Sequence, residues 1–147
     1  MADKKVDVNK DLKSVWSQAS FAEPHSQYTT VLLDGSIEKG ISQPHNHVIV
    51  EEYLGPDDEG LSLVKLRKTQ DRMLLAVVGI LDAVRTQRNV SYWIRSGGLH
   101  FMDLIGCGMA REVWFRNPEF VECWKTRGIQ VLGELGIDVL ARSKRSS

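Results

Sequence analysis

Apolar residues recur at helical spacing in one long segment near the middle of the chain. Met73, Val77 and Ile80 fall on one face of a helix, and further apolar neighbours widen that face beyond a narrow seam. We therefore predict a core helix over residues 70–88. Asn89 follows it and is expected to close its C-terminal end, because asparagine tolerates the left-handed conformation found there.

A second helix is predicted near the C-terminus, where the sequence reads Asn117-Pro118-Glu119. Asparagine is a good N-cap, proline suits the first helical position, and an acid in the first turn complements the helix dipole. The helix should run toward Leu135, with Gly136 as its C-terminal cap. Two internal glycines weaken it by up to about 1 kcal/mol each.

Runs rich in β-branched and aromatic residues predict strands elsewhere, bounded by turn-forming residues. The predicted strands cover residues 28–34, 45–54 and 61–67, the last of which could instead open the next helix, followed by a hairpin over 90–105 and a last short strand or helical turn at 137–140. Strands joined by tight turns favour antiparallel pairing. The expected fold class is therefore α+β, a mainly antiparallel sheet with two principal helices packed on one face, plus a short N-terminal helix or arm.

The chain of 147 residues has the length of a single domain. We expect an N-terminal arm over residues 1–26, which contains a short helix anchored by Trp16, and a single α+β domain over residues 27–141. The basic segment 142–147 is expected to be a disordered tail.

Composition is that of an ordinary globular protein, with 42% hydrophobic and 26% charged residues. The sequence contains neither an apolar run of about 18 residues, which a membrane helix needs, nor a secretory signal. A cytoplasmic protein without membrane association is therefore expected. Its two cysteines, Cys107 and Cys123, lie among apolar neighbours and are expected to be reduced and buried.

Charge is distributed unevenly along the chain although the net charge is zero. Residues 1–60 hold 5 Lys and Arg against 11 Asp and Glu, whereas residues 61–147 hold 14 against 8. This asymmetry could attract an anionic partner such as RNA, or could let the two halves attract each other. The candidate nucleic-acid-binding residues are Arg67, Lys68, Arg72, Arg88, Arg95, Arg111, Arg116, Lys125 and Arg127.

The segment Pro44-His45-Asn46-His47 offers candidate metal ligands. In a strand, His45, His47 and Glu51 would project to one side, which suits a divalent metal ion. This spacing, with Gly40 ahead of it, resembles the first motif of the cupin family, and the resemblance implies that these three residues are metal ligands in an enzyme. The chain lacks the family's second motif, and the long helix over residues 70–88 does not fit an all-β barrel. Solvent-exposed histidines on a strand remain the alternative.

Four tryptophans, Trp16, Trp93, Trp114 and Trp124, are candidate interface residues, although aromatic residues at helical spacing also fit a core. The sequence contains no complete catalytic set, and no cofactor is expected unless the histidine pair binds a divalent metal. Together these features favour a non-enzymatic binding and assembly protein, a homo-oligomer with basic surface for an anionic partner such as RNA. A cupin-like metal-dependent enzyme and a protein adaptor without nucleic acid are the alternatives.

Overall fold

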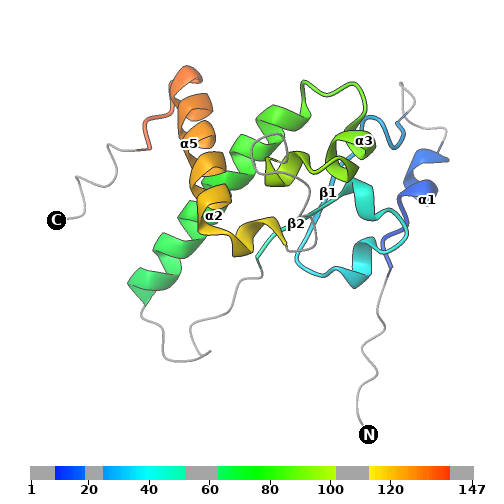
Figure 1. The fold of residues 1–147 in the computed structure, drawn as a ribbon, viewed down its shortest axis with the longest axis horizontal. Helices are drawn as coiled ribbons and strands as arrows, with labels where there is room; N and C mark the ends of the chain where they lie inside the picture. Colours follow the sequence, from blue (N-terminus) through cyan, green and yellow to red (C-terminus); the bar gives the residue numbers. More distant parts are fainter. Residues whose placement is uncertain (1–8, 19–24, 52–62, 102–112, 140–147) are drawn as a thin grey trace, which may run out of the picture. The chain divides into compact units, whose positions relative to one another are not determined.

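The computed structural model describes residues 9–18, 25–51, 63–101 and 113–139, except for the side chains of residues 63–71 (Figure 1). Contacts divide the chain into two compact units. Unit 1 comprises Met1–Glu52 and Gln87–Gly98, and unit 2 comprises Tyr53–Thr86 and Leu99–Ser147. The expected basic tail lies outside the described residues.

The described residues contain four α-helices, α1, α2, α3 and α5, and a small two-stranded parallel sheet. The prediction of a mainly antiparallel sheet with two helices packed on it is therefore wrong. Strands β1 (Leu32–Asp34) and β2 (His47–Ile49) pair in parallel, with Leu32 opposite His47. The connection between them contains two short 3-10 turns, Glu38–Gly40 and Pro44–Asn46. A connection of only a dozen residues, without an α-helix, is at the short end of what joins parallel strands. For that reason the sequence favoured antiparallel pairing.

Unit 1 is organised around a buried amide. Asn46 is 2% exposed, and its side-chain nitrogen donates to the carbonyl oxygens of Gln27 (2.7 Å) and Thr30 (2.9 Å). Val48 in β2 is fully buried. Because an unpaired amide would cost free energy in such a core, these two hydrogen bonds fix the segment before β1 against the turn before β2.

Helix α1 (Leu12–Trp16) confirms the predicted N-terminal helix and packs on its own unit. Asp11 caps it by accepting from the Lys13 amide at 3.0 Å, and Leu12 is buried. The Trp16 indole nitrogen donates to the Thr30 hydroxyl at 2.9 Å. Trp16 therefore anchors this helix within the chain, a point that the sequence left open.

Helix α3 (Val90–Arg95) replaces the first strand of the predicted hairpin, which is wrong here. The Asn89 side chain accepts from the Tyr92 amide at 2.9 Å, so Asn89 starts this helix instead of closing the preceding one. A local N-cap thus outweighs the strand propensity of the β-branched and aromatic residues that follow it. Most of the second predicted hairpin strand lies outside the described residues.

Helices α2 (Leu63–Val84) and α5 (Pro118–Glu134) cross in unit 2 (Figure 1). At the crossing the two helix backbones are in contact at glycines, which have no side chain to separate them. A Cβ on Gly79 would lie 2.1 Å from the Trp124 carbonyl oxygen, and a Cβ on Gly128 would lie 1.9 Å from the Leu75 carbonyl oxygen. Only glycine permits so close an approach of two helices.

The core beside this crossing is aromatic. Trp124 and Trp114 are each 2% exposed, and the Trp124 indole nitrogen donates to the Leu99 carbonyl at 3.0 Å. Phe101 stacks on Trp124 with ring centroids 4.5 Å apart. Phe101 has φ of 49°, a conformation unfavourable for a bulky side chain, and this ring contact helps to offset its strain.

Both principal helices were predicted correctly in type. The first begins earlier than predicted, at Leu63, so residues 63–67 belong to this helix and not to a strand, which is the alternative that the sequence left open. The second has Asn117 as its N-cap and Gly136 at φ of 79° beyond its end, as predicted. No strand forms at the described residues 137–139, and no helix in the described ranges has the length and apolar character to cross a bilayer.

The glycine crossing predicts a sharp contrast between two substitutions in α5. Gly128→Ala should destabilise the protein by about 1–3 kcal/mol, because its methyl group must displace backbone atoms of α2. Gly133→Ala is the matched control, since a Cβ there has no neighbour within 4 Å, and it should stabilise the helix by up to about 1 kcal/mol. Urea denaturation measures the free energy of unfolding of both variants. Equal changes in this free energy would contradict a backbone contact between α2 and α5 at Gly128.

Candidate functional site

Asp34 ends strand β1, and both its carboxylate and its backbone carbonyl accept hydrogen bonds within unit 1. Its carboxylate accepts from Lys10 Nζ at 2.5 Å and from the Ser36 amide at 3.0 Å. The Lys10 hydrogen bond, helped by the Ser36 amide, lowers the pKa of Asp34 to about 2. The side chain is only 9% exposed. The chain thus holds an ionised carboxylate at the carboxyl end of a parallel strand, the side on which α/β proteins bind ligands.

The backbone carbonyl of Asp34 is also occupied. It accepts from the Val50 amide at 3.2 Å, and His47 Nε2 lies 2.9 Å from it. Because a carbonyl oxygen can only accept, this ring nitrogen carries the proton. On its other side the imidazole packs against Gly40, where a Cβ would lie 2.2 Å from His47 Nδ1. His47 therefore serves as a structural link between the strands and the turn.

The three predicted metal ligands do not form a metal site. His45 is exposed in the 3-10 turn before β2, so it does not share a strand face with His47, which is 5% exposed. Glu51 is exposed beyond the end of β2. Among the described residues, no group of three His, Cys, Asp or Glu side chains could hold a metal ion. The strand geometry on which the cupin-like interpretation depended is therefore wrong.

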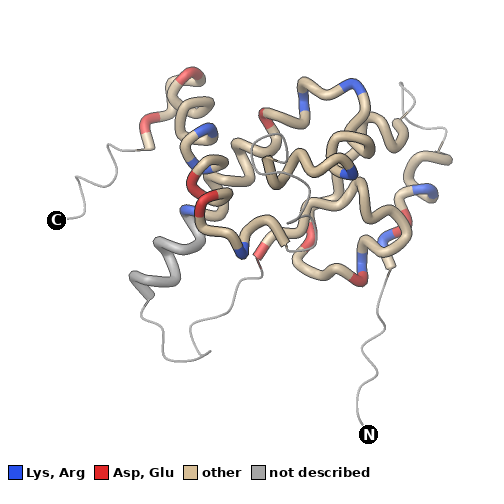
Figure 2. Tube along the Cα trace, in the orientation of Figure 1, with Lys and Arg blue, Asp and Glu red and all other residues tan. Residues whose placement is uncertain are grey.

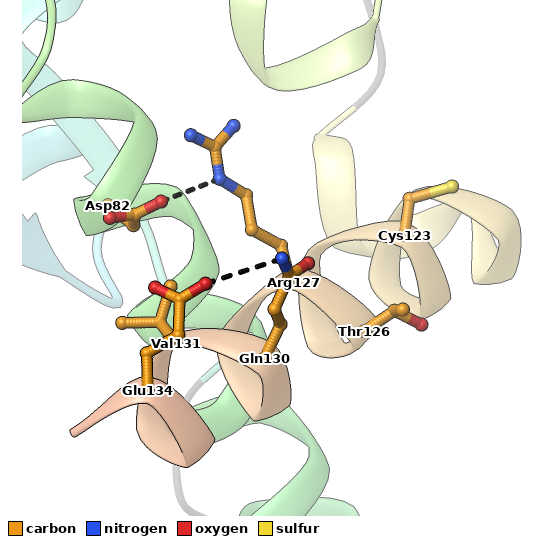
Figure 3. A pocket seen from close by; sticks show the side chains of 7 residues that line it. All are labelled: Asp82, Cys123, Thr126, Arg127, Gln130, Val131 and Glu134. Carbon is orange, nitrogen blue, oxygen red and sulfur yellow. Dashed lines mark hydrogen bonds and ion pairs between the residues drawn. The ribbon is translucent and has the colours of Figure 1, made fainter.

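A groove of about 450 Å³ runs along α5 in unit 2 (Figure 3). Asp82 of α2 lies at one side and accepts from Arg127 Nε at 2.9 Å and from Arg85 Nε at 2.7 Å. The hydrogen bond from Arg85, followed by that from Arg127, lowers the pKa of Asp82. Cys123 is exposed in this groove, contrary to the prediction of a buried thiol. The groove is polar, and its lining residue Arg127 is paired with Asp82 on the facing helix.

Several of the predicted basic residues are paired with carboxylates. In unit 2, Arg72 pairs with Glu122, Lys125 lies 3.8 Å from the same carboxylate, and Arg127 pairs with Asp82. Three other predicted residues, Arg88, Arg95 and Arg116, are exposed and have no ion-pairing carboxylate in the described part of the chain. The side chains of Arg67, Lys68 and Arg111 lie outside what the structure describes.

The charge asymmetry of the sequence disappears when residues are grouped by structural unit. Unit 1 contains seven Lys and Arg against eight Asp and Glu, and unit 2 contains twelve against eleven. The reason is that Arg88 and Arg95 belong to unit 1, whereas the acidic run at residues 57–59 belongs to unit 2. Figure 2 shows both signs of charge interspersed along the described chain. Local geometry, and not net charge, must therefore decide where an anion binds.

The four candidate interface tryptophans divide into two groups. Trp114 and Trp124 lie in the core of unit 2 and offer little surface to a second subunit. Trp16 and Trp93 are half-buried in unit 1. The Trp93 ring covers Gly98, where a Cβ would lie 2.2 Å from the ring.

Sequence reasoning missed the Asp34–Lys10 pair. The two residues are 24 positions apart, and only the folding of the N-terminal arm onto unit 1 brings them together. In the sequence, Asp34 was only the last residue of the strand predicted over residues 28–34. An acid placed directly after a run of β-branched and apolar residues was the available signal, since that is where the carboxyl end of a strand presents a side chain.

The chain is similar to a protein of the fission yeast Schizosaccharomyces pombe described as an uncharacterized FCP1 homology domain-containing protein. The two are 30% identical over 97 residues, which is 63% of this chain and 37% of the relative. The chain thus spans little more than a third of the relative's length. No protein-family model and no solved structure matches the chain.

The match to the yeast protein is long enough to show that one helix of this chain lies within the matched region. A match that occupies 63% of a chain of 147 residues must include the middle of the chain, wherever it begins. Helix α2 (Leu63–Val84) therefore lies within the region shared with the yeast protein.

The environment of Asp34 predicts a specific loss of stability in acid. Its pKa in the folded protein, about 2, lies below the ordinary value of 3.8, so the stabilisation is present above about pH 4 and is lost as the pH falls toward 2. Asp34→Asn should therefore be less stable than the parent at pH 6, and the difference should shrink as the pH approaches 2. Urea midpoints across this range measure it.

Glu38→Gln is the control for this experiment, because Glu38 is exposed and makes no ion pair in the described structure. This variant keeps the Asp34–Lys10 pair, so its urea midpoint should fall in acid as that of the parent does. A constant difference between Asp34→Asn and the parent would contradict the Asp34–Lys10 pairing.

Proposed function

We propose that the chain is a non-enzymatic binding and assembly protein that self-associates through the outer face of α2. This face is defined by Leu74, Val78 and Leu81, which recur at positions i, i+4 and i+7. Leu74 is 64% exposed and Leu81 is 40% exposed, although both lie in the longest helix of the described chain.

The single observation that carries this proposal is the distribution of side-chain size around α2. The face toward α5 uses small residues, with Ala76 at 0% and Ala83 at 3% exposure on either side of Gly79. Leu74 and Leu81 lie on the outer face, whereas the large side chain of Ile80 is fully buried. A helix that is apolar on both sides is normally covered on both sides. A second copy of the chain would bury these leucines and gain roughly 25 cal/mol for each Å² of apolar surface removed from water.

An anionic partner, with RNA as the candidate, is the second part of the proposal. Its support is that Arg88 and Arg95 in unit 1 are exposed and pair with no carboxylate among the described residues. Arginine binds phosphate through several hydrogen bonds at once, and an arginine without an acidic neighbour keeps that capacity.

Self-association is tested by light scattering coupled to size exclusion over a wide range of protein concentration. The molar mass of the parent should exceed the monomer mass of 16.6 kDa. The dissociation constant of the double variant Leu74→Gln/Leu81→Gln should be at least tenfold higher than that of the parent. Ile37→Gln/Ile41→Gln is the matched control, because these isoleucines in unit 1 are 60% and 66% exposed. A monomeric parent at high concentration, or an equal effect of the control pair, would overturn the proposal.

A second candidate function is favoured by the match to the yeast protein. The chain would be a portion of an FCP1 homology domain that functions together with a complementary portion. The parallel β1–β2 pair, with Asp34 at its carboxyl end, supports this reading because parallel strands usually belong to larger sheets covered on both faces.

This second candidate predicts a heterotypic complex. The part of the yeast relative outside the matched region, expressed separately, should bind the chain in a pull-down and in isothermal titration calorimetry. The negative heat-capacity change that accompanies burial of apolar surface is the expected signature. If no heat is released or absorbed at several temperatures and no complex is isolated, this candidate is rejected.

A further inference from the structure

Helix α3 combines an exposed aromatic ring with a cation placed over it. Tyr92 is 58% exposed, and the Arg95 guanidinium carbon lies 5.6 Å from the centre of its ring, within the range of a cation–π contact. Arg88 is exposed one residue before Asn89, the N-cap of the same helix. We call Arg88, Tyr92 and Arg95 the α3 patch.

The cations of the α3 patch are available, in contrast to most of the cations that the structure describes in unit 2. Arg72, Lys125 and Arg127 each have a carboxylate partner, which an anionic ligand would have to displace. Within the described residues, no carboxylate lies within ion-pairing distance of Arg88 or Arg95. An anion can therefore contact Arg88 and Arg95 without displacing a described carboxylate.

The helix that carries the patch is held firmly in unit 1. Its N-terminal amides are satisfied by the Asn89 side chain and by two backbone carbonyls, since Val90 donates to Tyr28 at 3.1 Å and Ser91 donates to Gln27 at 3.3 Å. The helix also packs against the 3-10 turn Pro44–Asn46. A binding surface on a fixed element loses less conformational entropy when a ligand binds.

We infer that the α3 patch binds single-stranded RNA, with a base stacked against Tyr92 and Arg95 and with phosphates contacted by Arg88 and Arg95. An exposed ring accepts the face of any base, and neighbouring guanidiniums supply both stacking and phosphate neutralisation. The inference deepens the anionic-partner part of the proposed function and rests on it, but it is independent of self-association.

The test is a fluorescence anisotropy titration of the full chain with a labelled 12-nucleotide oligouridine in low salt. Tyr92→Ser and Arg95→Gln should each weaken binding about tenfold, because each removes a stacking surface or a phosphate contact. In Arg88→Gln/Arg95→Gln, the slope of log Kd against log salt should fall by about 1.4, as expected for two phosphate contacts to a single strand.

Arg116→Gln is the matched control, because it removes the same charge from another exposed and unpaired arginine, in unit 2. Binding by this variant should remain within twofold of the parent. The circular dichroism spectrum of each variant should match that of the parent, which checks that the variant is folded. An equal loss for Arg116→Gln would show binding by overall charge and would overturn the inference.

Two further arms complete the test. A 12-base-pair RNA duplex should bind more weakly than the single strand, and equal binding would overturn the role of base stacking. Absence of binding to the oligouridine in low salt would overturn the inference as a whole. Light scattering on the same samples keeps the tests separate, because loss of RNA binding with unchanged mass leaves the self-association proposal standing.

Discussion

The backbone contact between α2 and α5 at Gly79 and Gly128 is the constraint on which unit 2 depends. Because the helix backbones touch at these glycines, only small side chains fit directly between them, and Ile80 of α2 is buried beside the contact. Leu74 and Leu81 consequently occupy the outer face. One steric requirement thus shapes how the unit packs and leaves these two leucines exposed to solvent.

Ion pairing then determines which of the many cations can act on a ligand. Asp82 and Glu122 hold arginines and a lysine from α2 and α5 within unit 2. A basic composition is therefore not equivalent to a basic surface. On α3, by contrast, Arg95 is placed over an aromatic ring and not beside an acid. The distinction depends on which side chains meet in the folded unit, and it is invisible when charges are counted along the sequence.

Helix α5 could be predicted from the sequence because its signals are local, namely Asn117 at one end and Gly136 at the other. The long core helix was equally clear from its periodicity. The parallel pairing of β1 and β2 could not be predicted, because three-residue strands carry almost no pattern and their pairing depends on the burial of Asn46. The Asp34–Lys10 pair was hidden for a similar reason, since it joins distant segments.

The central claim is that α2 turns small residues inward and presents its leucines to a second copy of the chain. Methyl NMR with a soluble paramagnetic agent tests it most directly. The methyl groups of Ala76 and Ala83 should be protected at every concentration, whereas those of Leu74 and Leu81 should be strongly relaxed in dilute protein and become protected as concentration rises. Leucine methyls that stay equally relaxed at all concentrations would contradict the account, as would alanine methyls relaxed as strongly as the leucines.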